Sequence, residues 1–376
     1  MRLCKVVYIV VLLFFSLQFT HATGYVDLST YDGKKYKDSQ EGLIEGLFES
    51  GWSEFKSSLK ETIFTDNINS EKFWNTLRIS LQNGSFYNRL TNYQTFENMT
   101  GSDLFLKALY SSIEQIPVKY KSVLPNGDSI MLSGKIFLPK NTKAKHIIIA
   151  NHFTICANSE APSNAYSIEG IYAIKDYIVL MPDYIGYGIT DSLTHPYLHL
   201  KSSVTSAIDL LDAAVPYLKS RSYTYFPSVI LLGYSQGAAV TLALQKELEQ
   251  NYSHKYAIYK VFAGAGPYDL AGTFDYYISH HTTDIPCTLP MLVLGMNYGE
   301  NLGLDTQDFF QPVLQEKYPL LIESKAKMMH EVNQELGNDM NVLLKPIVFQ
   351  TDSLPTSILY EAVKRNSILQ WTPKSN

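Results

Sequence analysis

Four short segments of this chain are apolar at nearly every position, and they constrain the fold more than any other feature. They are HIIIA at 146–150, YIVLM at 177–181, VILLG at 229–233 and AIYKVFAGA at 257–265. Such runs are typical of strands covered on both faces of a sheet. Helical stretches lie between them, notably Val204 to Leu218 and Ala238 to Leu248. This alternation predicts an α/β fold in which helices flank a mostly parallel central sheet.

An antiparallel pair of strands is expected to precede the parallel part. The stretch IPVKYKSVLPNGDSIMLSGKIFLPK begins at Ile116 and carries two β-type segments around Asn126-Gly127-Asp128. That tripeptide is a turn signal between antiparallel strands. The chain has 376 residues, of which 45% are hydrophobic. This is enough for one large domain with insertions or for two smaller domains.

The first residues have the pattern of a cleavable export signal. Basic residues are followed by an apolar stretch from Val6 to about Phe19 and then by small residues. We therefore predict a signal peptide at 1–22 and a mature chain that is secreted, periplasmic or extracellular. The alternative is a membrane anchor, which needs roughly 18 or more apolar residues. This stretch is shorter and is interrupted by Ser16 and Gln18.

The rest of the chain divides by the spacing of its apolar residues. Segment 23–109 has mostly helical spacing and is predicted to be an N-terminal helical extension. The α/β core is predicted over 110–275. A helix-like region over 276–370 is predicted to be a cap or lid, which either roofs a pocket or only packs against the core.

Charge and cysteine content exclude some classes of protein. The net charge is -5, and no basic run interrupts the sequence, so a nucleic-acid partner is disfavoured. After cleavage of the signal peptide only Cys156 and Cys287 would remain. They could form one disulfide bond in an oxidising compartment but not a disulfide scaffold. Whether they pair is not decided by the sequence.

The motif Gly233-Tyr234-Ser235-Gln236-Gly237 follows an apolar strand and precedes an Ala-rich helix. In this context G-x-S-x-G predicts a sharp turn that exposes the hydroxyl of Ser235 as a nucleophile. The two glycines are needed because the turn brings backbone segments too close for a Cβ atom. The positive end of the following helix and the N–H of Gln236 would stabilise an oxyanion. The alternative is a tight turn with no catalytic role.

A second oxyanion donor is expected in the loop directly after HIIIA. The backbone near Phe153 is the candidate donor, and His152 is interpreted as a structural or pocket-lining residue. Farther along, Asp183, His195 and His199 invite comparison with a catalytic relay or a metal site. They do not have metal-ligand spacing, and structural hydrogen bonding is the favoured interpretation. No metal is predicted.

Several segments together resemble the secretory lipase family of α/β-hydrolases, especially its bacterial members. The segments are IIIANHFTICANSEAPSN, VLMPDYIGYG, THPYLH, LLGYSQGA and VFAGAGPYDLAGTFD. The resemblance spans roughly Ile116 to Trp371 and implies a secreted serine carboxylesterase with a helical cap, acting on acylglycerols or other carboxylic esters. It implies Ser235 as nucleophile, with Gln236 and the backbone of His152 or Phe153 as oxyanion hole. It implies no cofactor and no stable protein partner, with transient contact at a lipid interface.

A serine nucleophile needs a histidine base, and that histidine needs an orienting acid. After Ser235 the only histidines are His254, His280, His281 and His330. None follows a credible late strand, so no catalytic histidine is assigned.

The resemblance implies that segment 371–376 starts a further core strand, and that the sequence stops before the last two strands with their acid and histidine. Asp269 is a candidate substitute acid.

Three functions follow from these patterns. The first is a serine esterase or lipase, with activity impaired by the missing acid and histidine. The second is a non-catalytic degenerate hydrolase, either lipid-binding or a functionless fragment. The third is a peptidase of related fold.

Overall fold

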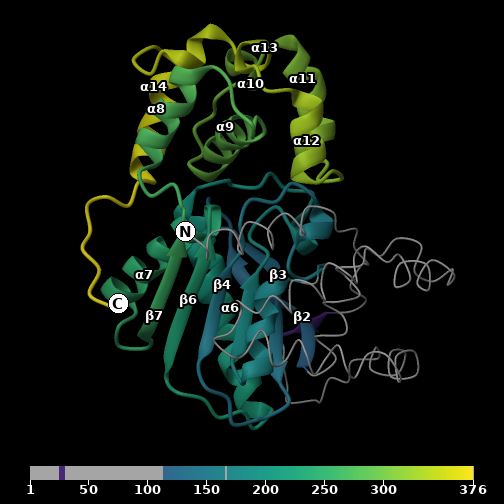
Figure 1. Ribbon diagram of the computed structural model, residues 1–376, viewed down its shortest axis with the longest axis vertical. Coiled ribbons are helices and arrows are strands. Elements are labelled where there is room, and N and C mark those ends of the chain that lie inside the picture. The colour runs from purple at the N-terminus through teal and green to yellow at the C-terminus, as the bar shows by residue number, and fades with distance from the viewer. Residues whose placement is uncertain (1–24, 30–112, 166, 376) are drawn as a thin grey trace, which may run out of the picture. The chain divides into compact units, whose positions relative to one another are not determined.

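The computed structural model describes residues 25–29, 113–165 and 167–375 (Figure 1). All of them belong to one of two compact units into which the chain divides, the unit made of Thr20–Tyr36 and Ile113–Asn376. The predicted signal peptide and nearly all of the predicted helical extension lie outside the described residues.

The described residues form a seven-stranded mixed sheet with the order β1-β2-β3-β5-β4-β6-β7. Its strands are β1 Val26–Asp27, β2 Ile113–Val123, β3 Ser129–Pro139, β4 Ile147–Asn151, β5 Ile178–Pro182, β6 Ser228–Tyr234 and β7 Ala257–Gly264. Strand β3 pairs antiparallel with both β2 and β5. From β5 to β7 every neighbouring pair is parallel.

The sequence located the sheet well. Each of the four apolar runs is a strand, and the antiparallel hairpin turns at the predicted tripeptide, where Gly127 has a φ of 91°. One expectation was wrong. Residues 26–27, inside the predicted helical extension, form β1, which pairs parallel with β2. Two residues are too few for a periodicity, and only the neighbouring strand makes them extended.

Two long helices cover the sheet, as predicted. Helix α6, Leu200–Ser220, packs against β2 and α7, and α7, Gln236–Asn251, packs against β4, β6 and β7 (Figure 1). The faces turned to the sheet carry residues such as Leu210, Leu211 and Leu244, which are fully buried. This packing fixes the position of the first turn of α7, where the candidate nucleophile lies.

Strand β7 differs from the other parallel strands. Its sequence predicts a strand covered on both faces, but its side chains alternate between exposed and half-buried. Tyr259 and Phe262 are 53% and 56% exposed. The reason is position: β7 is the last strand in the order of the described sheet, with β6 on one side and α7 against it.

A group of helices follows the last strand, in the region predicted to be a cap, and is called the cap below. The helices are α8 Leu270–His280, α9 Thr288–Gly299, α10 Thr306–Phe309, α11 Pro312–Tyr318, α12 Met329–Leu336, α13 Met340–Leu343 and α14 Thr356–Arg365. The expected boundary between 275 and 276 falls inside α8, because that helix continues without a break from its N-cap at Asp269.

The end of the described chain does not begin a strand. Residues 371–375 have no regular secondary structure. The N–H groups of Lys374 and Ser375 donate instead to the carboxylate of Glu249, at 3.0 Å and 2.8 Å. The prediction of a strand from position 371 was therefore wrong for these residues, whose backbone donors are satisfied by the last turn of α7.

Polar side chains join the cap to the core at two places. In one, the Nζ of Lys325 donates to the carbonyl oxygens of Asp191 and Leu193, at 2.9 Å and 2.7 Å. In the other, Asn366 accepts from the N–H of Leu200 at the start of α6 and donates to Glu300 at the end of α9.

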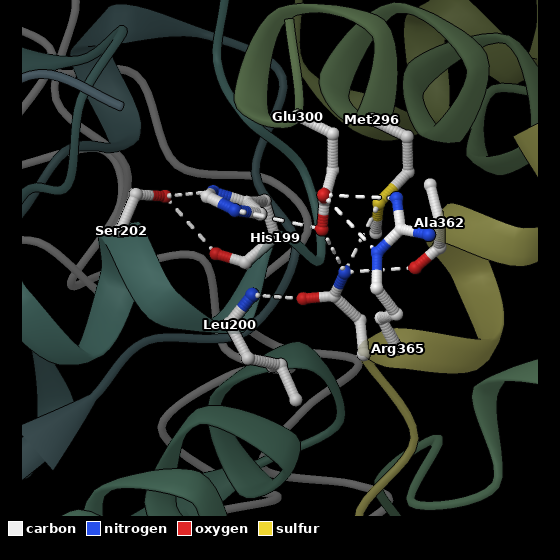
Figure 2. Close-up of polar contacts among 8 residues, drawn as sticks. His199, Leu200, Ser202, Met296, Glu300, Ala362 and Arg365 are labelled. Carbon is white, nitrogen blue, oxygen red and sulfur yellow. Dashed lines mark hydrogen bonds and ion pairs between the residues drawn. The ribbon is translucent and has the colours of Figure 1, made fainter. Parts of the chain in front are cut away.

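Figure 2 shows the surroundings of Glu300 at this second junction. The carboxylate also accepts from Arg365 at 3.0 Å, and the Nε2 of His199 lies 3.9 Å away. A cleft of about 610 Å³ opens beside these residues, between α6, α7 and the ends of α9 and α14.

Candidate active site

Ser235 lies at the junction of β6 and α7 in a backbone conformation that few residues adopt. Its φ is 55° and its ψ is -121°. Such a conformation costs on the order of 1–3 kcal/mol and persists only where the surroundings impose it. The Ser235 N–H donates to the carbonyl of Gly264 at 2.9 Å, and the side chain is half-buried. This is the strained strand-to-helix turn that the sequence motif predicts.

The two glycines of the motif are required by the packing. A Cβ atom on Gly233 would lie 2.1 Å from the carbonyl oxygen of Gly237, and one on Gly237 would lie 2.0 Å from that of Asn151. Backbone atoms cannot give way at such distances without a shift of the strand or helix. Between them Tyr234 is 46% exposed, so this residue of the motif contributes little to the buried packing.

Asn151, which the sequence analysis did not single out, ties the end of β4 to the turn. Its amide donates to the hydroxyl of Thr241 on α7 at 2.9 Å, and its side-chain oxygen accepts from the hydroxyl of Tyr184 at 3.2 Å. All three side chains are buried. Asn151 is a polar residue at the end of an otherwise apolar strand, two positions before the proposed oxyanion donor. This pattern could have identified Asn151 from the sequence.

The predicted oxyanion donors are the main-chain N–H groups of Gln236 and Phe153. Gln236 is the first residue of α7, and the first four N–H groups of a helix have no partner within it. Phe153 lies in the loop after β4 and is half-buried, and its N–H donates no hydrogen bond within the described residues. Glycine 237 packs against the backbone of Asn151 and His152, so the helix start and this loop are in contact.

The side chain of Gln236 is held by His195. Its Nε2 lies 3.0 Å from the Nε2 of His195, whose Nδ1 lies 2.7 Å from the carbonyl oxygen of Ile185. The carbonyl can only accept, so Nδ1 carries the hydrogen and Nε2 accepts from the amide. Burial lowers the pKa of His195 to about 3. His195 is therefore a neutral structural histidine with both ring nitrogens in use.

His152 is also neutral, so only one of its two ring nitrogens carries a hydrogen and can donate to a carbonyl. Its Nδ1 lies 2.7 Å from the carbonyl oxygen of Phe153, and its Nε2 lies 3.2 Å from that of Asp183. Burial lowers its pKa to about 4, although both carbonyl contacts act in the opposite direction. The ring packs on Tyr184, with centroids 4.3 Å apart. The interpretation of His152 as a residue that supports the loop agrees with these contacts.

Asp183 is fully buried and connects strand β3 with the loop that contains Ser163. One carboxylate oxygen accepts from the hydroxyl of Ser133 at 2.5 Å, and the other accepts from the N–H of Ser163 at 2.8 Å. Burial raises the pKa of this carboxyl group. Gly188 has a φ of 61°, and a Cβ there would lie 2.1 Å from Asp183. The expected structural role of Asp183 agrees with this geometry, and its partners are hydroxyl and amide groups, not a histidine.

The base that Ser235 needs is not supplied by the described histidines. The Ser235 hydroxyl makes no hydrogen bond within the described residues. His254 follows the far end of α7, a 16-residue helix that is about 24 Å long. His280 and His281 lie at the far end of α8, and His330 is exposed on α12.

Asp269, the candidate substitute acid, is exposed and serves as the N-cap of α8. Its carboxylate accepts from the N–H of Gly272 at 2.9 Å. This bond satisfies one of the donors at the start of that helix.

The described residues contain no group of three or more His, Cys, Asp or Glu side chains that could hold a metal ion. Within the same part of the chain, no helix combines the length and apolar character needed to cross a membrane. The 610 Å³ cleft is lined by the outer side of α7, including Lys246 and Glu247, and Ser235 is not among its lining residues.

Comparison with known proteins identifies the fold. The structure is similar to the ligand-bound rice cell wall degrading esterase LipA from Xanthomonas oryzae, with a TM-score of 0.62 and 21% sequence identity, over 73% of this chain and 78% of that one. It is equally similar to a putative hydrolase from Legionella pneumophila, with a TM-score of 0.62 and 22% identity, over 70% and 72% of the two chains. The chain has the α/β-hydrolase fold.

A more distant similarity connects the chain with Candida antarctica lipase A, at a TM-score of 0.53 and 14% identity, over 71% of this chain and 65% of that one. A scan against protein-family profiles finds no match. A sequence comparison with curated proteins also finds none. The similarity is therefore one of fold, and the secretory lipase family suggested by the motifs stays a prediction.

Proposed function

We propose that this chain is a serine hydrolase of carboxylic esters, such as acylglycerols, that acts through an acyl-enzyme at Ser235. The observation that carries the proposal is the strained backbone of Ser235 at the first turn of α7, between glycines that have no room for a Cβ atom. Esterases and a lipase among the structures of similar fold support the choice of ester substrates.

The proposed reaction begins with attack of the Ser235 hydroxyl on the ester carbonyl carbon. The hydroxyl proton passes to a base, and the carbonyl oxygen becomes an oxyanion that accepts from the N–H groups of Gln236 and Phe153. Collapse expels the alcohol, which takes up the proton, and leaves the acyl group on Ser235. Water then releases the acid by the same two steps. Each oxyanion donor is expected to contribute about 3–4 kcal/mol to stabilisation of the transition state.

A second candidate function is lipid binding without turnover. It is favoured by His195, which lies against Gln236, because both of its ring nitrogens are used in structural contacts. Without a base, a triad enzyme typically loses on the order of a million-fold in turnover. In either function we propose that the mature chain is exported and meets its ligand at a lipid surface, without a stable protein partner.

A labelled fluorophosphonate and a short-chain nitrophenyl ester distinguish the two functions. The full chain is expected to incorporate the label at Ser235 slowly and to hydrolyse the ester at an impaired rate that still exceeds the uncatalysed one, because the described histidines supply no base. Ser235→Ala is expected to abolish both. Ser279→Ala is the matched control, because that exposed hydroxyl contacts only groups of its own helix α8, the carbonyl of Tyr276 and the Nδ1 of His280. The label is located by peptide mass spectrometry.

Two outcomes contradict the enzymatic proposal. One is incorporation and turnover that persist in Ser235→Ala. The other is a folded protein that takes up no label and hydrolyses the ester at the uncatalysed rate. In the second outcome, binding of a fluorescent fatty-acid ester to the same protein would support the lipid-binding function.

A further inference from the structure

Cys156 and Cys287 lie far apart in the sequence but are neighbours in the structure. Cys156 is in the loop after β4, and Cys287 is the N-cap residue of α9 in the cap. Their side chains are 2% and 0% exposed and belong to the same apolar cluster. The Cys156 sulfur lies 3.8 Å from the sulfur of Met291, whose N–H donates to the carbonyl of Cys287 one turn earlier on α9, and the Cys287 thiol influences the pKa of Cys156.

The main chain on both sides of the pair is fixed. The N–H of Cys156 donates to the carboxylate of Glu160 at 3.2 Å, and the N–H of Cys287 donates to the side chain of Asn333 at 3.0 Å. Each of the two segments that carry the cysteines is therefore held in place by a hydrogen bond.

The surroundings do not suit a reactive thiolate. Burial and the contact with Cys287 raise the pKa of Cys156 well above its usual value, and the nearby Glu160 acts in the same direction. A methionine sulfur of the same cluster, the thioether of Met291, lies 3.8 Å from the Cys156 sulfur. Reactive cysteines lie in electropositive and partly exposed positions, so a nucleophilic role for this pair is not supported.

We propose that Cys156 and Cys287 form a disulfide bond that joins the loop after β4 to the first turn of α9. The bond forms by thiol–disulfide exchange with an oxidised dithiol protein or glutathione disulfide. One thiol loses its proton and attacks the donor disulfide, which expels one thiol. The second cysteine then displaces the other, so that two protons and two electrons pass from the pair to the donor. The thiols are exposed before the core closes, so oxidation belongs to folding in an oxidising compartment.

The proposed bond ties the cap to the core at a point three residues after Phe153. It closes a loop of about 130 residues, and a loop of that length lowers the conformational entropy of the unfolded chain considerably. The inference does not depend on the chemistry of Ser235. The proposed disulfide requires only that the two sulfur atoms approach each other, which the packing of α9 against the loop after β4 favours.

The test is a thiol count on the full chain, which has three cysteines. The protein is refolded with a mixture of reduced and oxidised glutathione, or with dithiothreitol, then denatured and alkylated with iodoacetamide. We expect one alkylated cysteine, Cys4, after oxidation and three after reduction. A non-reducing tryptic digest should contain peptide 146–175 linked to peptide 261–317. Three alkylated cysteines after oxidation, glutathione adducts on the pair, or a link to Cys4 would overturn the proposal.

Thermal unfolding supplies a second measurement. The oxidised protein is expected to melt about 5–10 °C above the reduced protein. Cys4→Ala should keep this difference, and Cys287→Ala should lose it. An equal redox-dependent shift in Cys287→Ala would contradict the assignment. If Cys287→Ala does not fold, the linked peptide in the unmodified chain still decides the question.

Discussion

Around Ser235, single polar side chains fix the backbone that the proposed chemistry requires. Asn151 joins β4 to α7, His195 holds Gln236, and His152 lies between two main-chain carbonyl groups and donates to one of them. Each of these groups is buried, and a buried polar group left without a partner costs about 1–3 kcal/mol. The site is therefore held by hydrogen bonds whose loss would be felt in stability as well as in reactivity.

The pH dependence of stability tests the structural role of His195. Its pKa is about 3 in the folded protein and near 6.5 when unfolded, so the unfolded state binds more protons as the pH falls below 6.5. Stability that is complete above pH 6.5 is therefore lost towards pH 3, by about 3 kcal/mol between pH 6.5 and pH 4.5. The glutamine of His195→Gln cannot take up a proton, so the loss of unfolding free energy that is due to His195 should be absent in this variant. Urea unfolding at a series of pH values measures the free energy of unfolding of both proteins.

His152 and Glu160 titrate in the same range and act in opposite directions. Burial raises the pKa of Glu160 to about 7, so its stabilising contribution is lost as the pH rises from its unfolded value to about 7. His152, with a pKa lowered to about 4, loses stability as the pH falls. Glu160 and His152 are present in both the parent protein and His195→Gln, so their contributions cancel in the difference between the two stability profiles. Parallel stability profiles for the two proteins would contradict the role given to His195.

Among the elements, β7 is the one whose sequence and environment disagree. Its apolar side chains would suit a strand covered on both faces, but Tyr259 and Phe262 are more than half exposed. A strand at the end of a sheet also presents unpaired backbone groups, which can pair with another chain. The combination predicts self-association through this strand.

Replacing Phe262 by lysine should reduce that self-association, because a charge on an exposed strand opposes strand pairing. The onset of light scattering on concentration or heating is expected to move to a several-fold higher protein concentration. The stability of the folded chain should change by less than about 0.5 kcal/mol, since the site is exposed. Tyr276→Lys is the matched control, because Tyr276 is 60% exposed on α8. An equal gain in the control would assign the effect to net charge alone.

At the scale of the whole molecule, the cap shares one buried apolar cluster with the core and is also joined to it by polar contacts. Lys325 is buried, and burial lowers its pKa. Its ammonium group is satisfied by main-chain carbonyls of Asp191, Leu193 and Glu323. Removal of the ammonium leaves carbonyl groups of the core loop without a donor, which costs about 1–3 kcal/mol per buried group.

Lys325→Met should therefore loosen the cap without unfolding the sheet. Amide hydrogen exchange in α11 and α12 is expected to accelerate by roughly 10- to 100-fold, with exchange in β4 and β6 unchanged. Lys327→Met is the control, because Lys327 is paired only with Glu335 on the cap itself and is 39% exposed. Uniform acceleration over the cap and the sheet would contradict the role of Lys325 as a local attachment.

The sequence by itself determined strands β2 to β7, the two long helices and the turn that carries Ser235, because these depend on local patterns. Runs of apolar residues, a turn tripeptide and two glycines around a serine are short-range signals. The tertiary structure decided the rest. It brought Cys156 to Cys287, made His195 the partner of Gln236, left β7 exposed and turned Asp269 into a helix cap. These outcomes depend on which distant segments become neighbours, and burial and hydrogen bonding between such segments have no signature in a local pattern.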